Sequence, residues 1–363
     1  MPMLRILHAA DFHLDSPFAG LTPEQAQRRR GEQRELLEDL AALARAEQAE
    51  LVLLPGDLLD GDRFYPETAQ ALTRALGSIP CPVLLSPGNH DFFSPQSVYA
   101  ALTWPENVHV FSSGELERFD LPELNCAVWG RAFTAPREDT SPLAGFSAPR
   151  DGALHIGCLH GDTTGGTDYA PISPEDMAQS GLTYLALGHI HQYSGLQKAG
   201  GTYWAYPGCP QGRGFDETGE KGVLLVDVDE GSVSTRFVPL ARRRYEILSV
   251  DLTGEESALG AIEAALPPNT QDHIYRILLT GEGETPDLAS LERALSGRFY
   301  GLTLRDHTRL PRDLWRRREE DTLTGLFLRE MQSLCEQEPD NEVYQLAVRF
   351  GLAALEGGED AAL

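Results

Sequence analysis

The sequence predicts an α/β fold in which a large amino-terminal domain is followed by a smaller α/β module and a helical tail. Three observations support this prediction. Short apolar runs alternate with amphipathic segments through the first two-thirds of the 363 residues. A second, smaller alternation begins after Arg242–Arg244, and only helical periodicity remains after Pro311. The expected boundaries are residues 1–241, 242–308 and 309–363.

Five apolar runs in the large domain have the length of buried strands. They are Leu4–Leu7, Leu51–Leu54, Val83–Leu85, His155–Leu159 and Tyr184–Leu187. The segments between the first three strands predict a long helix over Glu24–Gln48 and a second helix over Pro66–Leu76. A hairpin is expected next, with strands over Val223–Val228 and Val233–Pro239.

The smaller module is expected to have the order β-α-β-α-β. Its predicted elements are Tyr245–Leu252, Glu255–Leu266, His273–Thr280, Asp287–Leu295 and Gly301–Arg305. Two apolar stripes at helical spacing then predict two helices in the tail. The stripes are Leu323, Leu326, Phe327, Met331 and Leu334, and Val343, Leu346, Ala347 and Phe350.

Each of the five predicted strands of the large domain runs directly into a polar cluster. Because ligand groups of open sheets collect beyond the carboxyl ends of strands, we expect the clusters to meet. They are Asp11-Phe12-His13, Gly56-Asp57, Gly88-Asn89-His90-Asp91, His160-Gly161-Asp162 and Gly188-His189-Ile190-His191.

These residue types fit two divalent cations held close together. Asp57 follows a buried strand and a glycine, so its carboxylate is well placed to bridge the two cations. Carboxylate, imidazole and amide ligands together suit manganese, iron or zinc better than magnesium alone. Two such cations clamp the attacking and leaving oxygens of a phosphoryl displacement. His90, with Asp91 next to it, is the candidate proton or hydrogen-bond donor, and both are predicted catalytic residues.

The order of these five motifs resembles the calcineurin-like metallophosphoesterase superfamily. Two longer stretches, HAADFHLDSPF at His8–Phe18 and YPGCPQGRGFDE at Tyr206–Glu217, resemble the SbcD-type DNA repair exonucleases, most closely the YhaO-like branch. The motifs cover roughly residues 4 to 240, and the tail resembles the family only in layout.

The resemblance implies a β-sandwich flanked by helices, with the small module as a cap over the site. It implies that Asp11, His13, Asp57 and His191 hold one metal. It implies that Asp57, Asn89, His160 and His189 hold the second, and that His90 is catalytic. It further implies Mn²⁺ as the preferred metal, with Fe²⁺ or Zn²⁺ as alternatives. DNA would be the substrate, and the tail helices would dock on an SMC-like ATPase of the SbcC/YhaN type.

Several residues near the motifs admit two interpretations. Asp15 could face the substrate or cap a turn, and Asp60 fits a group that stabilises a loop or orients a ligand. Arg213 lies in a glycine-rich loop that could approach a phosphate or be purely structural. The basic runs at 28–30, 242–244 and 316–318 could touch DNA or form solvated faces.

The composition bears on partners and location. A net charge of −25 is unusual for a protein that binds nucleic acid alone, since phosphate contacts dominate such affinity. Five scattered cysteines without a CxxC pair favour a reducing compartment. With no apolar run of membrane-spanning length and no secretory signal, we expect a cytoplasmic protein without a membrane anchor.

Three functions remain open. The first is a manganese-dependent nuclease subunit that cuts DNA in repair, with the ATPase partner supplying much of the DNA grip. The second is a phosphatase or phosphodiesterase for another phosphoester, although Leu14 and Asp91 stand where protein phosphatases of the superfamily tend to have glycine and glutamate. The third is a metal-stabilised scaffold, which would be expected to have lost ligands. The sequence leaves a homodimer open.

Overall fold

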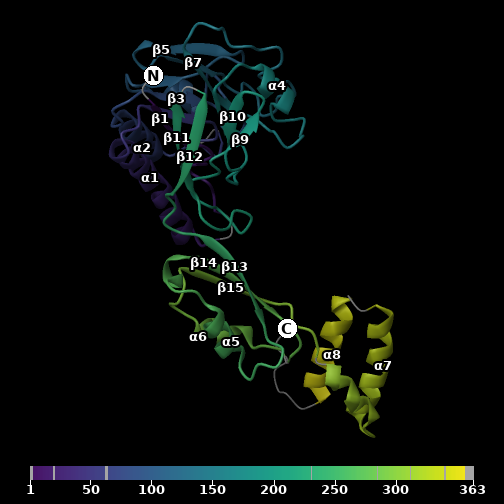
Figure 1. The fold of residues 1–363 in the computed structure, drawn as a ribbon. Coiled ribbons are helices and arrows are strands. Elements are labelled where there is room, and N and C mark those ends of the chain that lie inside the picture. The colour runs from purple at the N-terminus through teal and green to yellow at the C-terminus, as the bar shows by residue number, and fades with distance from the viewer. Residues whose placement is uncertain are drawn as a thin grey trace. The chain divides into compact units, whose positions relative to one another are not determined.

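The computed structural model describes residues 3–18, 21–61, 64–229, 231–283, 285–310, 312–338 and 341–355. The chain divides into two compact units, Met1–Arg244 and Tyr245–Leu363 (Figure 1). Among the helices of these described segments, none is both long and apolar enough to cross a membrane.

The first unit contains two six-stranded sheets. The first sheet has the order β12 (Ser232–Pro239), β11 (Gly222–Asp229), β1 (Leu4–His8), β2 (Leu51–Pro55), β3 (Val83–Ser86) and β4 (Val108–Val110). The second has the order β5 (Glu117–Leu121), β6 (Cys126–Gly130), β7 (Leu154–His160), β8 (Tyr184–Gly188), β10 (Thr202–Ala205) and β9 (Gln197–Ala199). The five predicted strands and the hairpin strands are thus confirmed, and Glu230 in the expected turn lies outside the described residues.

The two sheets pack face to face, which confirms the expected β-sandwich flanked by helices. Strand β2 shows why, because successive side chains of a strand point to opposite faces. Val52 and Leu54 pack in a cluster with α1 (Pro23–Ala46) and α2 (Pro66–Gly77), while Leu53 packs in a second cluster with residues of the other sheet. Because both faces are covered, all five residues of β2 are buried.

The carboxyl ends of the parallel strands carry the polar clusters. Strands β1, β2 and β3 run parallel in the first sheet, and β7 and β8 run parallel in the second. Strand β2 packs on both β7 and β8 across the sandwich. The five clusters therefore come from two sheets and meet where β2 faces β7 and β8.

Strands β4, β5, β6, β9 and β10 were not predicted. Three of them have only three or four residues, and β5 alternates between half-buried and exposed positions. Such short or half-exposed segments carry little hydrophobic signal, because their pairing is decided by neighbouring strands. This reason does not apply to β6, which has five residues and is mostly buried.

The second unit begins with a small sheet in which all strands are parallel, in the order β13 (Tyr245–Asp251), β14 (Ile274–Thr280) and β15 (Gly301–Asp306). Helices α5 (Ala258–Ala265) and α6 (Leu288–Ala294) connect the strands, so the predicted β-α-β-α-β order is confirmed. A 3₁₀ segment (Arg312–Glu319) and two helices, α7 (Leu323–Gln337) and α8 (Glu342–Leu355), follow.

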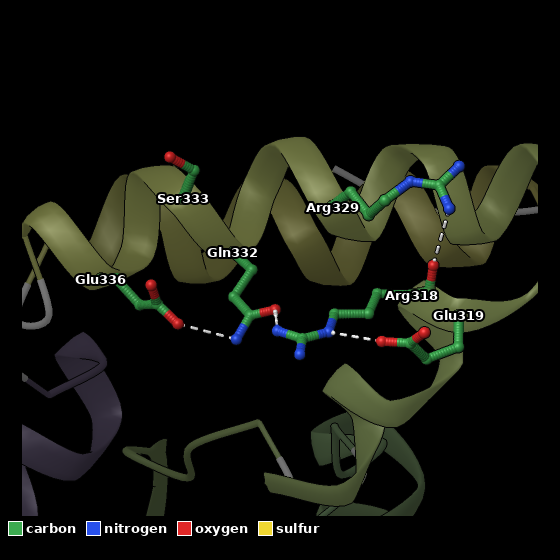
Figure 2. A pocket seen from close by; sticks show the side chains of 6 residues that line it. All are labelled: Arg318, Glu319, Arg329, Gln332, Ser333 and Glu336. Atoms are coloured by element: carbon green, nitrogen blue, oxygen red, sulfur yellow. Dashed lines mark hydrogen bonds and ion pairs between the residues drawn. The ribbon is translucent and has the colours of Figure 1, made fainter.

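The apolar stripe predicted for α7 is only partly buried. Leu328 and Met331 form the small core with Val348 of α8, whereas Leu323 and Leu326 are exposed. A polar pocket lies between the 3₁₀ segment and α7, and Figure 2 shows hydrogen bonds and ion pairs among most of the residues that line it. Arg318, for example, donates to Gln332 at 2.7 Å and pairs with Glu319.

Candidate metal centre

The polar clusters at the strand ends form one buried group. Asp11, His13, Asp57 and His160 are each at most 2% exposed. Asp11, His13, Asp57 and His189 also adopt positive φ values of 56°, 44°, 50° and 118°. Left-handed backbone is costly for residues with a β-carbon and concentrates at functional sites. The strained turns at the strand ends are therefore the local feature that directs these side chains into one space.

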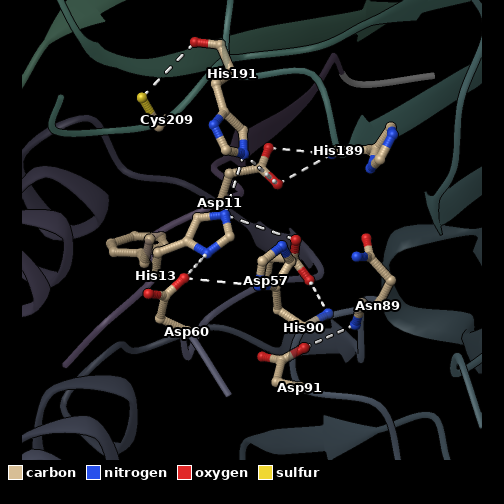
Figure 3. Close-up of polar contacts among 12 residues, drawn as sticks. Asp11, His13, Asp57, Asp60, Asn89, His90, Asp91, His189, His191 and Cys209 are labelled. Atoms are coloured by element: carbon tan, nitrogen blue, oxygen red, sulfur yellow. Dashed lines mark hydrogen bonds and ion pairs between the residues drawn. The ribbon is translucent and has the colours of Figure 1, made fainter. Parts of the chain in front are cut away.

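A first set of donors comes from the loop after β1 and the loop after β8. Ligand atoms of Asp11, His13 and His191 all lie within 4.8 Å of one another. The Nε2 atoms of His13 and His191 are 3.1 Å apart, and His191 Nε2 lies 4.0 Å from Asp11 Oδ1 (Figure 3). Three donors this close, two of them imidazole nitrogens facing each other, match a metal ligand set better than a hydrogen-bonded pair.

A second set is arranged around His160. Its Nε2 lies 2.9 Å from Asn89 Oδ1 and 3.5 Å from Asp57 Oδ2. The ring of His189 lies 5.2 Å from the ring of His160, centroid to centroid, and the His189 backbone N–H donates to Asp11 Oδ1 at 3.0 Å. Asp57 also lies 3.6 Å from His13 Nε2, so its carboxylate stands between the two sets.

The electrostatics of the site fit bound cations. Burial, followed by the charge of Asp91, raises the pKa of Asp57 to about 7. Burial and the neighbouring Asp57 raise the pKa of Asp11 as well. Burial lowers the pKa of His13 to about 3 and that of His160 to about 4, so both imidazoles are neutral and can offer a lone pair. Adjacent buried carboxylates with neutral imidazoles are suited to positive charge.

Carboxylates and a backbone carbonyl orient three of the imidazoles. His13 Nδ1 lies 2.9 Å from Asp60 Oδ1, and His191 Nδ1 lies 2.7 Å from Glu217 Oε1. His160 Nδ1 lies 3.1 Å from the carbonyl of Pro55. In each case Nδ1 is engaged and Nε2 faces the centre, which is the arrangement that fixes the tautomer of a metal-binding histidine.

Glu217 was not predicted as a site residue from the sequence. It is 4% exposed and is the last residue of the Tyr206–Glu217 stretch. Its place in this glycine-rich loop is the sequence feature that could have identified it as a site residue. Burial acts to raise the pKa of Glu217, but hydrogen bonds from His191 and Arg213 hold it well below its usual range. Glu217 therefore remains an acceptor beside His191.

Arg213 lies between the two orienting carboxylates. Its Nη1 lies 3.1 Å from Asp60 Oδ1, and its Nη2 lies 2.8 Å from Glu217 Oε1. The backbone N–H of Arg213 also donates to Glu217 Oε2 at 2.7 Å. These contacts favour the structural interpretation of Arg213 over the expected contact with a substrate phosphate.

Asp15 and Asp91 hold the backbone of the site. Asp15 accepts from the Tyr65 N–H at 2.8 Å and from the Thr68 hydroxyl at 2.7 Å, at the start of α2, which favours a cap over substrate contact.

Asp91 accepts from the N–H groups of Gly88 and Leu59 and from the Tyr99 hydroxyl. The expected catalytic role of Asp91 finds no support in these contacts, which fix the loop that carries Asn89 and His90.

His90 adjoins the centre and remains accessible. Its side chain is 45% exposed, and its backbone N–H donates to Asp57 Oδ1 at 3.0 Å. Its Nδ1 lies 3.6 Å from Asp60 Oδ1, so the carboxylate beside this imidazole is Asp60 and not Asp91. His90 is therefore accessible to solvent at the edge of the two donor sets.

All three basic runs have partners within the chain, and that of Arg318, in the third run, is Glu319. Arg29 is fully buried, pairs with Glu32 and donates to the carbonyl of Gly212 at 2.9 Å, which anchors the glycine-rich loop to α1. Arg243 pairs with Glu32 at 2.7 Å, and Arg244 pairs with Glu220 at 2.6 Å. These cations are engaged with acidic side chains of the chain itself.

Comparison with known proteins gives consistent matches. A family model described as calcineurin-like phosphoesterase matches residues 4–193. The uncharacterized metallophosphoesterase YhaO of Bacillus subtilis (strain 168) is 34% identical over 262 residues, which cover 69% of this chain and 64% of that protein.

Two further relatives are named as subunits of the nuclease SbcCD. The one from Rhodobacter capsulatus is 26% identical over 397 residues, which cover 89% of this chain and 94% of that protein. The one from Bacillus subtilis (strain 168) is 24% identical over 276 residues, which cover 64% of this chain and 68% of that protein.

Proposed function

The chain belongs to the calcineurin-like phosphoesterase family, and from this membership we propose that it is a nuclease that hydrolyses phosphodiesters of DNA with two divalent cations. Members of this family are metal-dependent phosphoester hydrolases. The observation that carries the proposal is the position of Asp57, whose carboxylate stands between the His13 and His160 donor sets at 3.6 and 3.5 Å. A carboxylate between two sets of imidazole donors is suited to bridge two cations.

The proposed ligands are Asp11, His13, Asp57 and His191 for one cation and Asp57, Asn89, His160 and His189 for the other. When bound, such cations acidify water and offset the negative charge of a reacting phosphate. The remaining chemistry belongs to His90, which lies beside Asp60 and is open to solvent. It donates a proton or a hydrogen bond to the phosphate or to the leaving oxygen.

The DNA substrate is supported by the relatives named as nuclease subunits and by the stretches around Asp11 and Arg213. The proposed activity is that of an exonuclease, with endonuclease activity as a further possibility, dependent on Mn²⁺ and acting in DNA repair. The free buried cysteines among the described residues agree with a reducing cytoplasm.

A partner protein would supply much of the grip on DNA. The chain carries a net charge of −25, and its basic residues Arg29, Arg243 and Arg244 pair with its own glutamates. Since phosphate contacts dominate DNA affinity, an SMC-like ATPase of the SbcC/YhaN type is the proposed source of positive surface. DNA repair as the setting rests on the resemblance of the sequence motifs to SbcD-type DNA repair exonucleases.

The second candidate is a phosphatase or phosphodiesterase acting on another phosphoester. It is favoured by the same charge pattern, because a small substrate needs no extended basic surface. A metal-stabilised scaffold is disfavoured, since all seven expected ligand side chains are present and lie at the strand ends.

The test is cleavage of end-labelled single- and double-stranded DNA by the full chain, with Mn²⁺, Mg²⁺ or EDTA. A His90→Ser variant serves as the control, with its metal content measured by elemental analysis. Cutting that depends on Mn²⁺ and is lost in His90→Ser at unchanged metal content supports the nuclease. Turnover of bis(4-nitrophenyl) phosphate without cutting of any DNA, with or without the ATPase partner, favours the second candidate. Normal DNA cutting by metal-loaded His90→Ser would contradict the role of His90.

A further inference from the structure

His189 differs from the other three proposed imidazole ligands in how its ring is held. The rings of His13, His160 and His191 each engage an oxygen atom through Nδ1. For His189, the described residues provide no hydrogen bond to the ring, and only its backbone N–H donates, to Asp11 (Figure 3). The orientation of this imidazole therefore depends on the side chains that pack against it.

Two aromatic rings supply that packing. The ring of His160, itself a proposed ligand, lies 5.2 Å from the His189 ring, centroid to centroid, with the planes at 77°. The ring of Tyr169 lies 5.0 Å from the His189 ring, with the planes at 39°, and belongs to neither donor set. Tyr169 is half-buried, whereas residues 164–168 before it are exposed. Its ring therefore leaves an exposed loop to contact a proposed ligand.

Hydrogen bonds on both sides fix the backbone at Tyr169. The Asp162 N–H donates to the Tyr169 carbonyl at 2.9 Å. The Glu138 N–H donates to the Asp168 carbonyl at 2.9 Å, and the Ala170 N–H donates to the Glu138 carbonyl at 2.7 Å. These contacts tie the loop after β7 to its own beginning and to the loop after β6, so the tyrosine ring is held in place from two directions.

Ala170, directly after Tyr169, adopts a strained backbone. Its φ is 48° and it is fully buried, although a residue with a β-carbon rarely adopts left-handed backbone. A β-carbon at Gly161, next to His160, would lie 2.6 Å from the Ala170 carbonyl oxygen, so this loop packs directly on the segment that carries a proposed ligand. Such strain persists only where the surroundings enforce it, and it concentrates at functional sites. The strain at Ala170 therefore points to a function for the ring beside it.

A tyrosine ring suits an imidazole that binds a cation. The separation of 5.0 Å lies within the range of about 4.5–7 Å in which aromatic pairs attract. Coordination through a ring nitrogen draws electron density from the imidazole and leaves it partly positive, and positive charge within about 6 Å of an aromatic centroid is attracted to the ring. The contact between Tyr169 and His189 is therefore stronger with the cation bound than without it.

We propose that Tyr169 is the positioning residue of His189 and thereby sets the cation affinity of the second donor set. This inference rests on the proposed pair of cations. The imidazoles of the first donor set have Asp60 and Glu217 as their orienting partners. Loss of the Tyr169 ring should therefore weaken the binding of one cation and spare the other.

The experiment titrates the metal-free full chain with Mn²⁺ by calorimetry. The wild type should bind two cations. In Tyr169→Leu one of the two should bind about tenfold more weakly or worse, the loss typical of an orienting contact, and the other with wild-type affinity. Tyr169→Phe keeps the ring and should bind both cations as the wild type does. The matched control is Tyr203→Leu, which changes a tyrosine on β10 that contacts Lys198, and it should also bind both.

Electron paramagnetic resonance separates a positioning role from general damage to the fold. Two Mn²⁺ ions that share a carboxylate give an exchange-coupled spectrum, whereas a lone Mn²⁺ ion gives six lines. At two equivalents of Mn²⁺, the wild type and Tyr169→Phe should give the coupled spectrum and Tyr169→Leu the six-line spectrum. The melting temperature of the metal-free chain shows whether Tyr169→Leu is folded, and Tyr169→Met replaces it if it is not.

Three results would overturn the inference. They are a coupled spectrum with two wild-type affinities in Tyr169→Leu, equal weakening of both cations in that variant, and a Tyr169→Phe that loses one cation as Tyr169→Leu does. None of these measurements involves DNA. A chain that binds two Mn²⁺ ions as expected but cuts no DNA contradicts the proposed substrate alone, whereas a wild type that binds fewer than two contradicts the pair of cations and this inference together.

Discussion

Glu217 Oε1 lies 2.7 Å from Nδ1 of His191, and this contact leaves Nε2 of the same imidazole facing His13 at 3.1 Å. Asp60 does the same for His13 from the other side, at 2.9 Å. Arg213 contacts both carboxylates, at 3.1 Å and 2.8 Å. The two imidazoles of one donor set are thus held by a single ionic network that is separate from the metal-facing atoms.

Replacing Glu217 by glutamine should weaken metal binding. The amide is a poorer acceptor for the His191 N–H, and loss of such an orienting carboxylate typically costs about 10–100-fold in metal affinity or activity. Mn²⁺ affinity is measured by calorimetry on the metal-free chain. Glu220→Gln, which changes an exposed glutamate paired with Arg244, is the matched control and should bind Mn²⁺ as the wild type does. Unchanged affinity in Glu217→Gln would refute the orienting role.

Replacing Arg213 by methionine should lower stability more than it changes substrate binding. Asp60 and Glu217 would lose their shared cation, and the loss in free energy of unfolding should be about 1–3 kcal/mol, between the values for exposed and buried pairs. Urea unfolding measures it, with Arg242→Met, which removes an exposed pair with Glu35, as the control. A raised KM for phosphodiesters at wild-type stability would instead restore the substrate-binding interpretation of Arg213.

Replacing Gly88 by alanine should displace the proposed bridging ligand. A β-carbon there would lie 2.6 Å from the backbone nitrogen of Asp57 and would also collide with its Oδ1. Overpacking of this kind costs about 1–3 kcal/mol, and the displaced carboxylate should weaken Mn²⁺ binding as well. The control is Gly201→Ala, where a β-carbon meets nothing within 4 Å. If Gly88→Ala has the melting temperature and the Mn²⁺ affinity of the wild type, the close packing of this loop on Asp57 is not required for stability or for metal binding.

The stabilisation by Mn²⁺ should grow as pH rises from about 5 to 8. Burial and Asp91 raise the pKa of Asp57 from 3.8 to about 7, so the neutral carboxyl stabilises the metal-free fold at low pH, and this contribution is lost as pH rises through about 7. A bound cation stabilises the ionised form. His13 and His160, with pKa values of about 3 and 4, stay neutral throughout this window.

Thermal melting at pH 5.5, 6.5 and 8, with Mn²⁺ and with EDTA, measures this effect. The difference in Tm between the two conditions should be largest at pH 8. Asp57→Asn should flatten the pH dependence, because it removes the titrating carboxyl. A Tm difference that is equal at pH 5.5 and pH 8 would exclude Asp57 as the group that couples metal binding to pH.

The sequence by itself determined the strand ends and the residue types that follow them. Val52 to Leu54 and Leu84 to Leu85 are apolar without alternation, which marks strands covered on both faces, and Asp57 and Asn89 lie in the short turns that follow them. The β-α-β-α-β order of the second unit also follows from local periodicity. These features depend on neighbours in the chain, so a pattern of residues is enough to reveal them.

Only the tertiary structure decided which polar clusters come from which sheet and which groups orient the proposed metal ligands. Asp60 and His13 are 47 residues apart in the chain, and Arg213 and Asp60 are 153 residues apart. The first contact arises because the loops after β1 and β2 lie side by side, and the second because the loop between β10 and β11 returns to them; no local pattern encodes either contact. For the same reason the carboxylate of Asp91, adjacent to His90 in the chain, points instead to Gly88, Leu59 and Tyr99. Hydrogen-bond partners of a buried side chain are set by proximity in space, because burial removes water and leaves only the groups that packing brings near.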